Sequence, residues 1–189
     1  MSTARRVHHS YEDYLHALEA SEIKLEYFDG EVYALAGGTL AHAELGARAI
    51  ALLTQALGNR CRVLTSDAKV QVEATGLATF PDATVSCGEM RSAANDRNAL
   101  VNPAVLVEVT SKGTEDYDRG EKLNQYRQIP SLKAVLLVSH RSVRVTVVER
   151  TPSGWATREV RASEQVALQD PELSLSVDAL YAGIALDAG

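Results

Sequence analysis

A short apolar run at residues 104–109, Ala-Val-Leu-Val-Glu-Val, constrains the fold of this chain more than any other stretch. A run this short and apolar, opened by Pro103, is typical of a strand covered on both faces. Side chains alternate along a strand, so Glu108 shares one face with Leu106 and Thr110. A carboxylate there is costly unless a cation or a strong donor meets it. Glu108 therefore either has a buried partner or reaches solvent at the end of the strand.

The segments after this strand predict a crossover unit. After Gly113, residues 114–128 follow a polar helical pattern with Thr114 as the N-cap, and Pro130 ends it. Residues 134–139 are rich in apolar and β-branched side chains, as in a second buried strand. A strand–helix–strand unit of this kind pairs its strands in parallel and folds its helix back over the sheet.

The N-terminal part predicts a short helix and a hairpin. Ser10 followed by Asp13 is a helix-start pattern, and apolar residues recur after it at helical spacing. Residues 24–36 form two segments around Asp29-Gly30, a dipeptide typical of tight hairpin turns.

A long helix is expected next, from Thr39 as its N-cap to Gly58 as its C-terminal cap. Its apolar stripe is expected at Leu40, Ala43, Ala47, Ile50, Leu53 and Leu57. Further strands are expected at 62–64, 69–72, 77–86, 141–149 and 155–160, with a short helix at 177–181. Residues 88–102 are polar and non-periodic, which predicts a loop. The whole pattern predicts an α/β (α+β mixed) fold, with a central mixed β-sheet flanked by helices.

Length and composition describe one globular domain. The chain has 189 residues, 46% hydrophobic and 23% charged, which is enough for one buried core and short for two. We expect a single domain over 1–189, with its core at about 39–149 and accessory strands and a short helix at 150–189. The net charge of −6 argues against a tight nonspecific nucleic-acid binder, although it is compatible with a local basic groove.

The cysteines and the lengths of the apolar runs indicate where in the cell the protein is expected. Cys61 and Cys87 lack the spacing of a metal site, and we expect reduced thiols, with Cys87 as a small buried apolar residue. The N-terminus lacks the apolar segment of a secretion signal, and no run is long enough to span a bilayer. We therefore expect a cytoplasmic protein with no membrane partner.

Asp82 is the acid most suited to meet Glu108. It follows Pro81 at the start of an expected strand and lies 26 positions before Glu108. If the two strands are neighbours, their carboxylates converge and repel each other unless one is protonated or a divalent cation lies between them. Oxygen ligands of this kind suit Mg²⁺ or Mn²⁺. Asp82 and Glu108 are thus the candidate metal ligands.

Lys122 is the candidate cation beside these acids. On the helix that follows the Glu108 strand, Asp118, Lys122 and Tyr126 line one side at spacings of four residues. The crossover folds this helix over its strand, which makes Lys122 a neighbour of Glu108. The alternative is a solvated lysine paired with Asp118, since most helix charges face water.

Four segments together resemble the Uma-type restriction endonuclease family, a branch of the PD-(D/E)XK nuclease superfamily. They are Leu25-Glu-Tyr-Phe-Asp-Gly-Glu, Phe80-Pro-Asp-Ala-Thr-Val, Pro103-Ala-Val-Leu-Val-Glu-Val-Thr-Ser and Asp118-Arg-Gly-Glu-Lys-Leu-Asn-Gln-Tyr126. The resemblance covers roughly residues 10 to 150 and implies a restriction-endonuclease-like fold. It also implies Mg²⁺-dependent hydrolysis of phosphodiester bonds in DNA and a homodimer that cuts both strands.

The same resemblance implies an acid–acid–lysine site. Asp82 is similar to the aspartate of the family's Pro-Asp pair, and Glu108 is similar to its second acid. The superfamily lysine stands two residues after that acid, where this chain has Thr110. A lysine moved to the following helix is an accepted variant, which assigns the role to Lys122. A metal held by the two acids would activate water, and Lys122 would orient that water or stabilise the developing anion.

The long helix begins with two further candidates, His42 and Glu44, since superfamily members often draw an auxiliary acid from their first core helix. Glu44 would bind a water or a second metal, and His42 would act as a base or contact phosphate. Surface or capping roles are the alternatives for both. Glu26 and Asp29 belong to the hairpin, and we expect a structural turn for Asp29 and a place outside the site for Glu26.

Two other function classes stay open. A nucleic-acid-binding or regulatory module could keep the fold with little activity, which the acidic composition and Thr110 favour. A partner-binding protein whose acids never meet is the third class. Metal-dependent cleavage lost in Asp82→Asn and Lys122→Ala supports the enzyme, whereas metal-independent DNA binding without cleavage supports the module.

Overall fold

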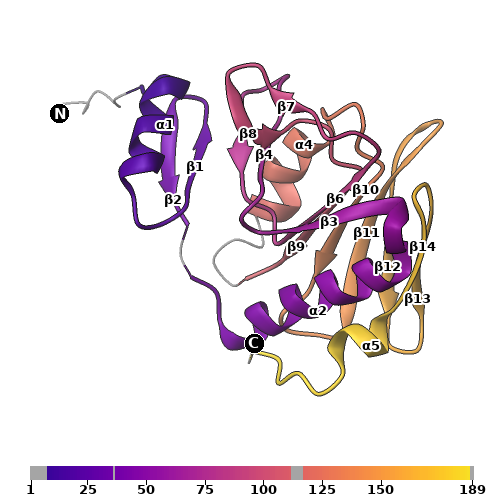
Figure 1. Cartoon of the computed structure of the whole chain (residues 1–189). Coiled ribbons are helices and arrows are strands. Elements are labelled where there is room, and N and C mark those ends of the chain that lie inside the picture. Colours follow the sequence, from indigo (N-terminus) through magenta and orange to yellow (C-terminus); the bar gives the residue numbers. More distant parts are fainter. Residues whose placement is uncertain (1–7, 36, 112–116, 188–189) are drawn as a thin grey trace, which may run out of the picture.

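The computed structural model describes residues 8–35, 37–111 and 117–187 (Figure 1). The elements in its first half are α1 (Tyr11–Ala20), β1 (Leu25–Phe28), β2 (Glu31–Ala34), α2 (Leu40–Leu57), the 3₁₀ turn η1 (Gly58–Arg60), β3 (Cys61–Thr65), β4 (Lys69–Gln71), β5 (Ala78–Thr79), β6 (Ala83–Cys87), β7 (Ser92–Ala93) and β8 (Asp96–Leu100). Those in its second half are β9 (Val105–Val109), the π-helical turn η2 (Asp118–Lys122), α4 (Leu123–Tyr126), β10 (Ala134–Val138), β11 (Arg144–Thr151), β12 (Gly154–Arg161), β13 (Gln165–Gln169), β14 (Glu172–Ser176) and α5 (Val177–Tyr181).

The strands form two six-stranded sheets and a separate hairpin. We call the sheet with the order β2-β1-β5-β4-β8-β7 the N-terminal sheet, and the sheet with the order β12-β11-β10-β9-β6-β3 the core sheet. In the core sheet β9 and β10 pair in parallel, from Val105 with Ala134 to Val109 with Val138, while their outer neighbours pair antiparallel. The predicted crossover and mixed sheet are therefore confirmed, and a second sheet is added to the single one expected.

The strand expected at 77–86 is in fact two strands in different sheets. β5 ends at Thr79 in the N-terminal sheet, and β6 begins at Ala83 in the core sheet. Pro81 interrupts the ladder because it has no N–H to donate. The chain thus passes from one sheet to the other directly before Asp82, and this crossing places Asp82 where the sheets meet.

The predicted N-terminal helix and the predicted hairpin are both confirmed. The Ser10 side chain accepts from the backbone N–H of Asp13, and the Asp13 carboxylate accepts from the backbone N–H of Ser10, so α1 has a complete capping box. In the hairpin, Asp29 and Gly30 have φ angles of 48° and 78°, as a two-residue turn with two left-handed residues requires.

Helix α2 begins and ends where the sequence predicts, with Thr39 as N-cap, but its buried stripe differs. The buried residues are Ala41, Leu45, Gly46, Ala49, Leu53 and Leu57. Leu53 and Leu57 were expected, whereas Leu40 is 86% exposed. The helix has alanine and leucine on several sides, so two different apolar stripes could have packed against the core. The structure buries the one that carries Leu45, which gives a larger apolar contact area than the alternative built on Ala43 and Ala47.

Two other expectations are corrected by the structure, and one hairpin is added in the region of the expected accessory strands. Residues 88–102 contain the β7–β8 hairpin; its exposed side chains gave no apolar alternation to detect. Cys61 and Cys87 form a disulfide, because β3 and β6 pair antiparallel with these two residues directly opposite. A β13–β14 hairpin follows β12. The expected cap Thr114 lies outside the described residues.

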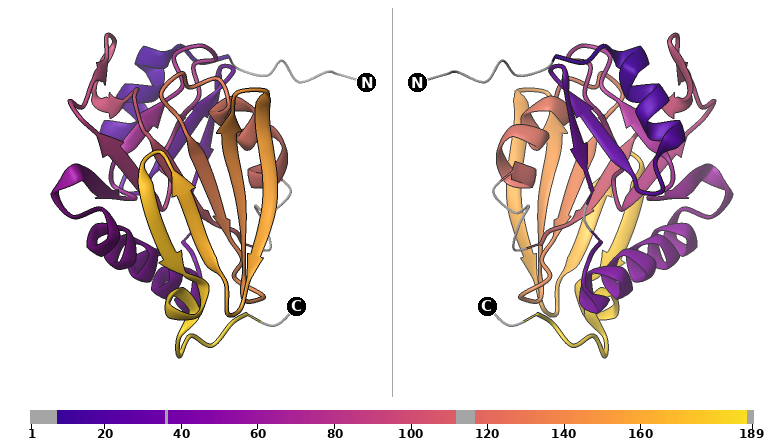
Figure 2. Two further views of the ribbon diagram at one scale, coloured as in Figure 1. Left: turned by 90° about the vertical axis from the view of Figure 1, so that its right-hand side faces the viewer. Right: turned by 90° about the vertical axis from the view of Figure 1, so that its left-hand side faces the viewer.

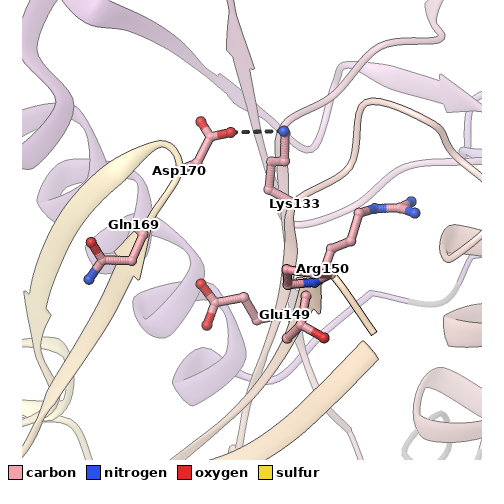
Figure 3. Close-up of a pocket in the computed structure, with 7 residues that line it drawn as sticks. Lys133, Glu149, Arg150, Gln169 and Asp170 are labelled. Carbon is pink, nitrogen blue, oxygen red and sulfur yellow. Dashed lines mark ion pairs between the residues drawn. The ribbon is translucent and has the colours of Figure 1, made fainter. Parts of the chain in front are cut away.

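The β13–β14 hairpin packs on the face of the core sheet that also carries α2. Asp170 at its turn forms an ion pair of 2.8 Å with Lys133, beside a surface hollow of about 310 Å³ (Figure 3). Figure 2 shows this yellow hairpin and α2 on one side of the core sheet and α4 on the other. In the described part of the chain, no helix has the length and apolar character needed to cross a membrane.

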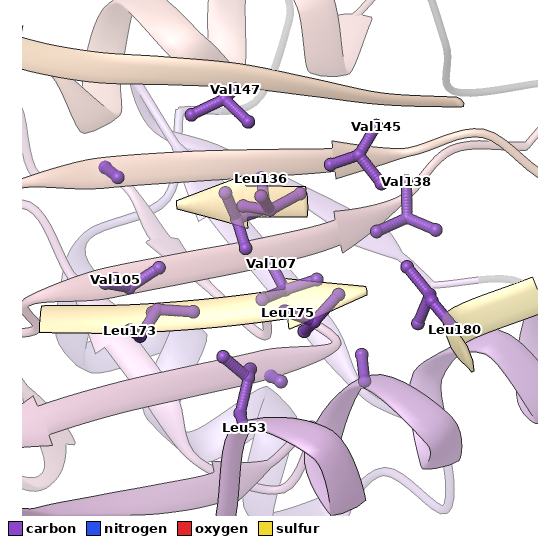
Figure 4. Packing of buried hydrophobic residues seen from close by; sticks show 14 of the residues in the cluster. Leu53, Val105, Val107, Leu136, Val138, Val145, Val147, Leu173, Leu175 and Leu180 are labelled. Atoms are coloured by element: carbon purple, nitrogen blue, oxygen red, sulfur yellow. The ribbon is translucent and has the colours of Figure 1, made fainter. Parts of the chain in front are cut away.

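The two faces of the core sheet belong to two different hydrophobic clusters. Val105 and Val107 of β9 pack with Leu53 of α2 and with β10, β11, β14 and α5 (Figure 4). Leu106 faces the other way and packs with the helix at 123–126 and with Val70 of the N-terminal sheet. This confirms the predicted alternation. It also puts Glu108, which shares the face of Leu106, between the core sheet, α4 and the N-terminal sheet.

Candidate active site

The buried partner of Glu108 is Lys122. Lys122 Nζ lies 3.0 Å from Glu108 Oε1, and each residue is 5% exposed. Tyr126, one helical turn after Lys122, donates from its hydroxyl to the same Oε1 at 2.5 Å. The crossover places both residues against β9, as the sequence predicts for a helix folded back over its strand. Glu108 is therefore a paired buried carboxylate and does not depend on solvent. The predicted partner Asp118 has a side chain outside the described part.

A second carboxylate, Glu26, shares the same ammonium. Lys122 Nζ lies 3.3 Å from Glu26 Oε1, and Thr79 donates its hydroxyl to that oxygen. Glu26 is 5% exposed, so the expectation that it stays outside the site is wrong. Strand alternation puts Glu26 on the face of Phe28, whose ring packs against the hydrophobic cluster around Leu106. The sequence predicts the alternation but not which face of the strand is covered.

Asp82 reaches the same region from the start of β6. The antiparallel register pairs Ala83 with Val107, so one step further along the ladder Asp82 is set opposite Glu108. Asp82 Oδ2 accepts a hydrogen bond of 2.7 Å from the backbone N–H of Val109. Its side chain keeps 18% exposure, which leaves it within reach of solvent and of a ligand. The register therefore sets the two acids opposite each other on adjacent strands, as the sequence predicts.

Burial raises the pKa of Asp82, and nearby positive groups act in the opposite direction. His42, the Val109 N–H, Lys122 and Lys24 each favour the ionised carboxylate. Lys122 also contacts Glu26 and Glu108 directly. We call Glu26, Asp82, Glu108 and Lys122 the acid–lysine cluster.

Helix α2 contributes His42 to this cluster but not Glu44. His42 Nε2 lies 3.5 Å from Asp82 Oδ2. Glu44 is two residues further along, which turns it about 200° around the helix, and it lines a hollow of about 350 Å³ with Ala47, Arg48, Ala51, Gly183 and Ile184. The expectation that Glu44 supplies an auxiliary acid is therefore not supported by its position.

Thr110 occupies the place of the superfamily lysine and is fully buried. Its hydroxyl contacts the Val138 carbonyl oxygen at 3.4 Å and His140 Nδ1 at 3.3 Å. The ammonium of the cluster comes instead from the following helix.

A neighbouring phenol, Tyr117 at the start of that helix, has a pKa raised to about 12, mainly by burial and next by the Glu26 carboxylate.

The donor set fits Mg²⁺ or Mn²⁺, which prefer hard carboxylate oxygens. Within the ranges that the structure covers, no three His, Cys, Asp or Glu side chains enclose a common point at metal-binding distance. Mg²⁺ does not require such a cage, because it is usually held by one or two carboxylates with water and substrate phosphates completing its coordination. Asp82 and Glu108 are two such carboxylates, on adjacent strands of the core sheet.

Comparison with known proteins identifies the family. The family model described as "Uma2: Putative restriction endonuclease" matches residues 11–187. The chain belongs to the Uma2 family. This confirms the resemblance that the four sequence segments carry and extends it from residue 150 to residue 187.

Two proteins of Synechocystis sp. (strain ATCC 27184 / PCC 6803 / Kazusa) are relatives of this Uma2 chain. Uncharacterized protein slr1290 is 36% identical over 181 residues, which cover 93% of each chain. Uncharacterized protein sll1609 is 29% identical over 134 residues, 70% of this chain and 76% of that protein.

A solved structure confirms the fold. The crystal structure of a "putative nuclease belonging to DUF820" from Anabaena variabilis ATCC 29413 superimposes with a TM-score of 0.72. The match covers 87% of this chain and 93% of that one at 15% sequence identity. At this identity the match establishes the architecture. It confirms the predicted restriction-endonuclease-like arrangement of mixed sheet and helices.

Proposed function

We propose that this Uma2 protein is a nuclease that hydrolyses phosphodiester bonds of DNA in the presence of Mg²⁺ or Mn²⁺. The observation that carries the proposal is the buried ammonium of Lys122, held 3.0 Å from Glu108 and 3.3 Å from Glu26, beside Asp82 on the neighbouring strand. A lysine buried with two acids beside a third, half-buried acid is expensive to maintain for stability alone. Family membership agrees with the proposal.

Each residue of the acid–lysine cluster has a role that follows from its contacts. Asp82 and Glu108 would hold the metal, which supplies charge to polarise the phosphate and to lower the pKa of a bound water. Lys122 would orient the attacking water or stabilise the negative charge that develops on the phosphate oxygens, a contribution often worth about 3 kcal/mol. Glu26, at 3.3 Å from Lys122 Nζ, would help to hold the ammonium beside Glu108. His42, at 3.5 Å from Asp82, would orient that carboxylate or contact the phosphate.

The test is cleavage of supercoiled plasmid DNA with and without Mg²⁺ or Mn²⁺. We expect the native protein to cut only with metal, and Asp82→Asn, Glu108→Gln and Lys122→Met each to lower the rate at least about 100-fold. Glu44→Gln is the matched control, because it neutralises an exposed acid on the same helix as His42 without touching the cluster. Equal rates in Asp82→Asn and the native protein would refute the proposal.

The same assay decides the second candidate, a DNA-binding module with little activity. The buried Thr110 at the usual lysine position is the observation that favours this candidate. A module would bind a labelled duplex equally with and without metal and would leave it intact.

Two finer properties are proposed with the nuclease. We propose a homodimer, which would bring one site to each strand of a duplex, and light scattering of the purified protein tests it. We also propose a cytoplasmic location, in which Cys61 and Cys87, which pair in the structure, would be kept reduced. Thiol labelling of the protein inside intact cells tests this proposal, and an oxidised pair there would contradict it.

A further inference from the structure

A second buried ion pair lies in the N-terminal sheet. Lys69 of β4 and Asp96 of β8 are on adjacent parallel strands, with Nζ 2.5 Å from Oδ2. Their side chains are 5% and 4% exposed. The desolvation penalty of such a pair often cancels its attraction, so an apolar pair in its place would stabilise the fold as well or better. The pair therefore calls for a role other than stability.

Helix α1 rests on this ion pair through two tyrosines. The Tyr11 hydroxyl donates to Asp96 Oδ2 at 3.0 Å, and the Lys69 ammonium lies 5.3 Å from the centre of the Tyr14 ring. Burial and the adjacent Asp96 carboxylate raise the pKa of Tyr11, so its phenol remains a donor at neutral pH. The pair thus fixes the rotation and depth of α1 against the sheet.

The same two tyrosines hold the residues on either side of Glu26. The Tyr14 hydroxyl donates to the Leu25 carbonyl oxygen at 2.9 Å. The rings of Tyr11 and Tyr14 each lie 5.4 Å from the ring of Tyr27. Leu25 and Tyr27 flank Glu26 in β1, so the carboxylate that contacts Lys122 is set by contacts that begin at the ion pair.

We infer that Lys69 and Asp96 are positioning residues for the acid–lysine cluster, acting through Tyr11 and Tyr14 on Glu26. The inference rests on the proposed nuclease function for its effect on cleavage, whereas its effect on β1 can be measured without activity. Holding Glu26 keeps the Lys122 ammonium at a fixed height above Glu108. A displacement of about 1 Å in such a group is enough to change a rate by a factor of up to about 100.

The first experiment is a double-mutant cycle between Asp96→Asn and Glu26→Gln. We expect Asp96→Asn to lower kcat about tenfold in the native background, with KM within about twofold, and to lower the residual kcat of Glu26→Gln by less than about twofold. A residue that only supports the fold would lower both backgrounds by the same factor, and that result would overturn the inference. Asp170→Asn is the matched control, since it neutralises an acid paired with an exposed lysine and should change neither.

The second experiment is hydrogen exchange of the native protein, Asp96→Asn and Asp170→Asn. We expect exchange of the β1 amides at 25–28 to become at least about tenfold faster in Asp96→Asn alone, with β9 and β10 unchanged. Unchanged exchange in β1, or equal acceleration in all strands, would overturn the inference. If the native protein never cuts DNA, the proposed function fails, and the exchange result still decides whether the ion pair positions β1.

Discussion

Removing the buried ammonium of Lys122 is the sharpest perturbation of the acid–lysine cluster. In Lys122→Met the side chain keeps its length, but Glu108 and Glu26 lose a cation at 3.0 and 3.3 Å while remaining 5% exposed. Removing one partner of a buried pair costs about 3–5 kcal/mol, because the other charge stays buried and uncompensated. Since two acids are left here, we expect the free energy of unfolding to fall by about 4–5 kcal/mol at pH 7.

The assay is urea unfolding of the native protein and the variant at pH 7. Adding Glu26→Gln and Glu108→Gln to Lys122→Met should restore most of the stability. Lys133→Met is the control: this lysine is 43% exposed and pairs with a solvated acid, so it should cost less than about 1 kcal/mol. A Lys122→Met loss no larger than that of the control would refute the reasoning.

Three further predictions follow from the fold. The pKa is raised above 10 for Tyr11, Tyr14, Tyr117, Tyr126 and Tyr181, to about 12 for Tyr117 and Tyr181. The stability these phenols contribute is complete below pH 10 and lost as the pH rises toward 12, so Tm should fall in that window and phenolate absorbance should rise with unfolding, not before it. In oxidised protein, Cys61→Ser with Cys87→Ser should cost about 3–4 kcal/mol for opening a loop with a sequence separation of 26, and no difference in urea midpoint would count against the disulfide. Leu53→Ala should cost about 2–5 kcal/mol and Leu40→Ala under about 0.5 kcal/mol, and similar losses would contradict the observed stripe of α2.

Local chemistry made much of the architecture predictable. The Ser10 capping box, the Asp29-Gly30 turn and the caps of α2 each depend on a few neighbouring residues, and all three are present. The parallel pairing of β9 and β10 followed from the length of their connection. The contact between Lys122 and Glu108 followed from the same crossover, because a short helix after a strand has one face available to that strand.

The incorrect predictions concern features that depend on packing between segments far apart in the sequence. The position of Glu26 depends on the N-terminal sheet lying against the face of β9 that carries Glu108, and no local pattern specifies that packing. The disulfide depends on the register of β3 with β6. The exposed faces of β7 and β8 carry no apolar alternation, so the sequence resembled a loop there. Tertiary pairing settled each of these cases.

The most direct test of the acid–lysine cluster is a crystal structure of the protein soaked with Mn²⁺, located by its anomalous scattering. We expect one peak about 2.1 Å from carboxylate oxygens of both Asp82 and Glu108, lost in Asp82→Asn crystals soaked in the same way. A peak bound elsewhere, or none at these two acids while the native protein still cuts DNA, would contradict the assignment of the cluster as a metal-dependent active site.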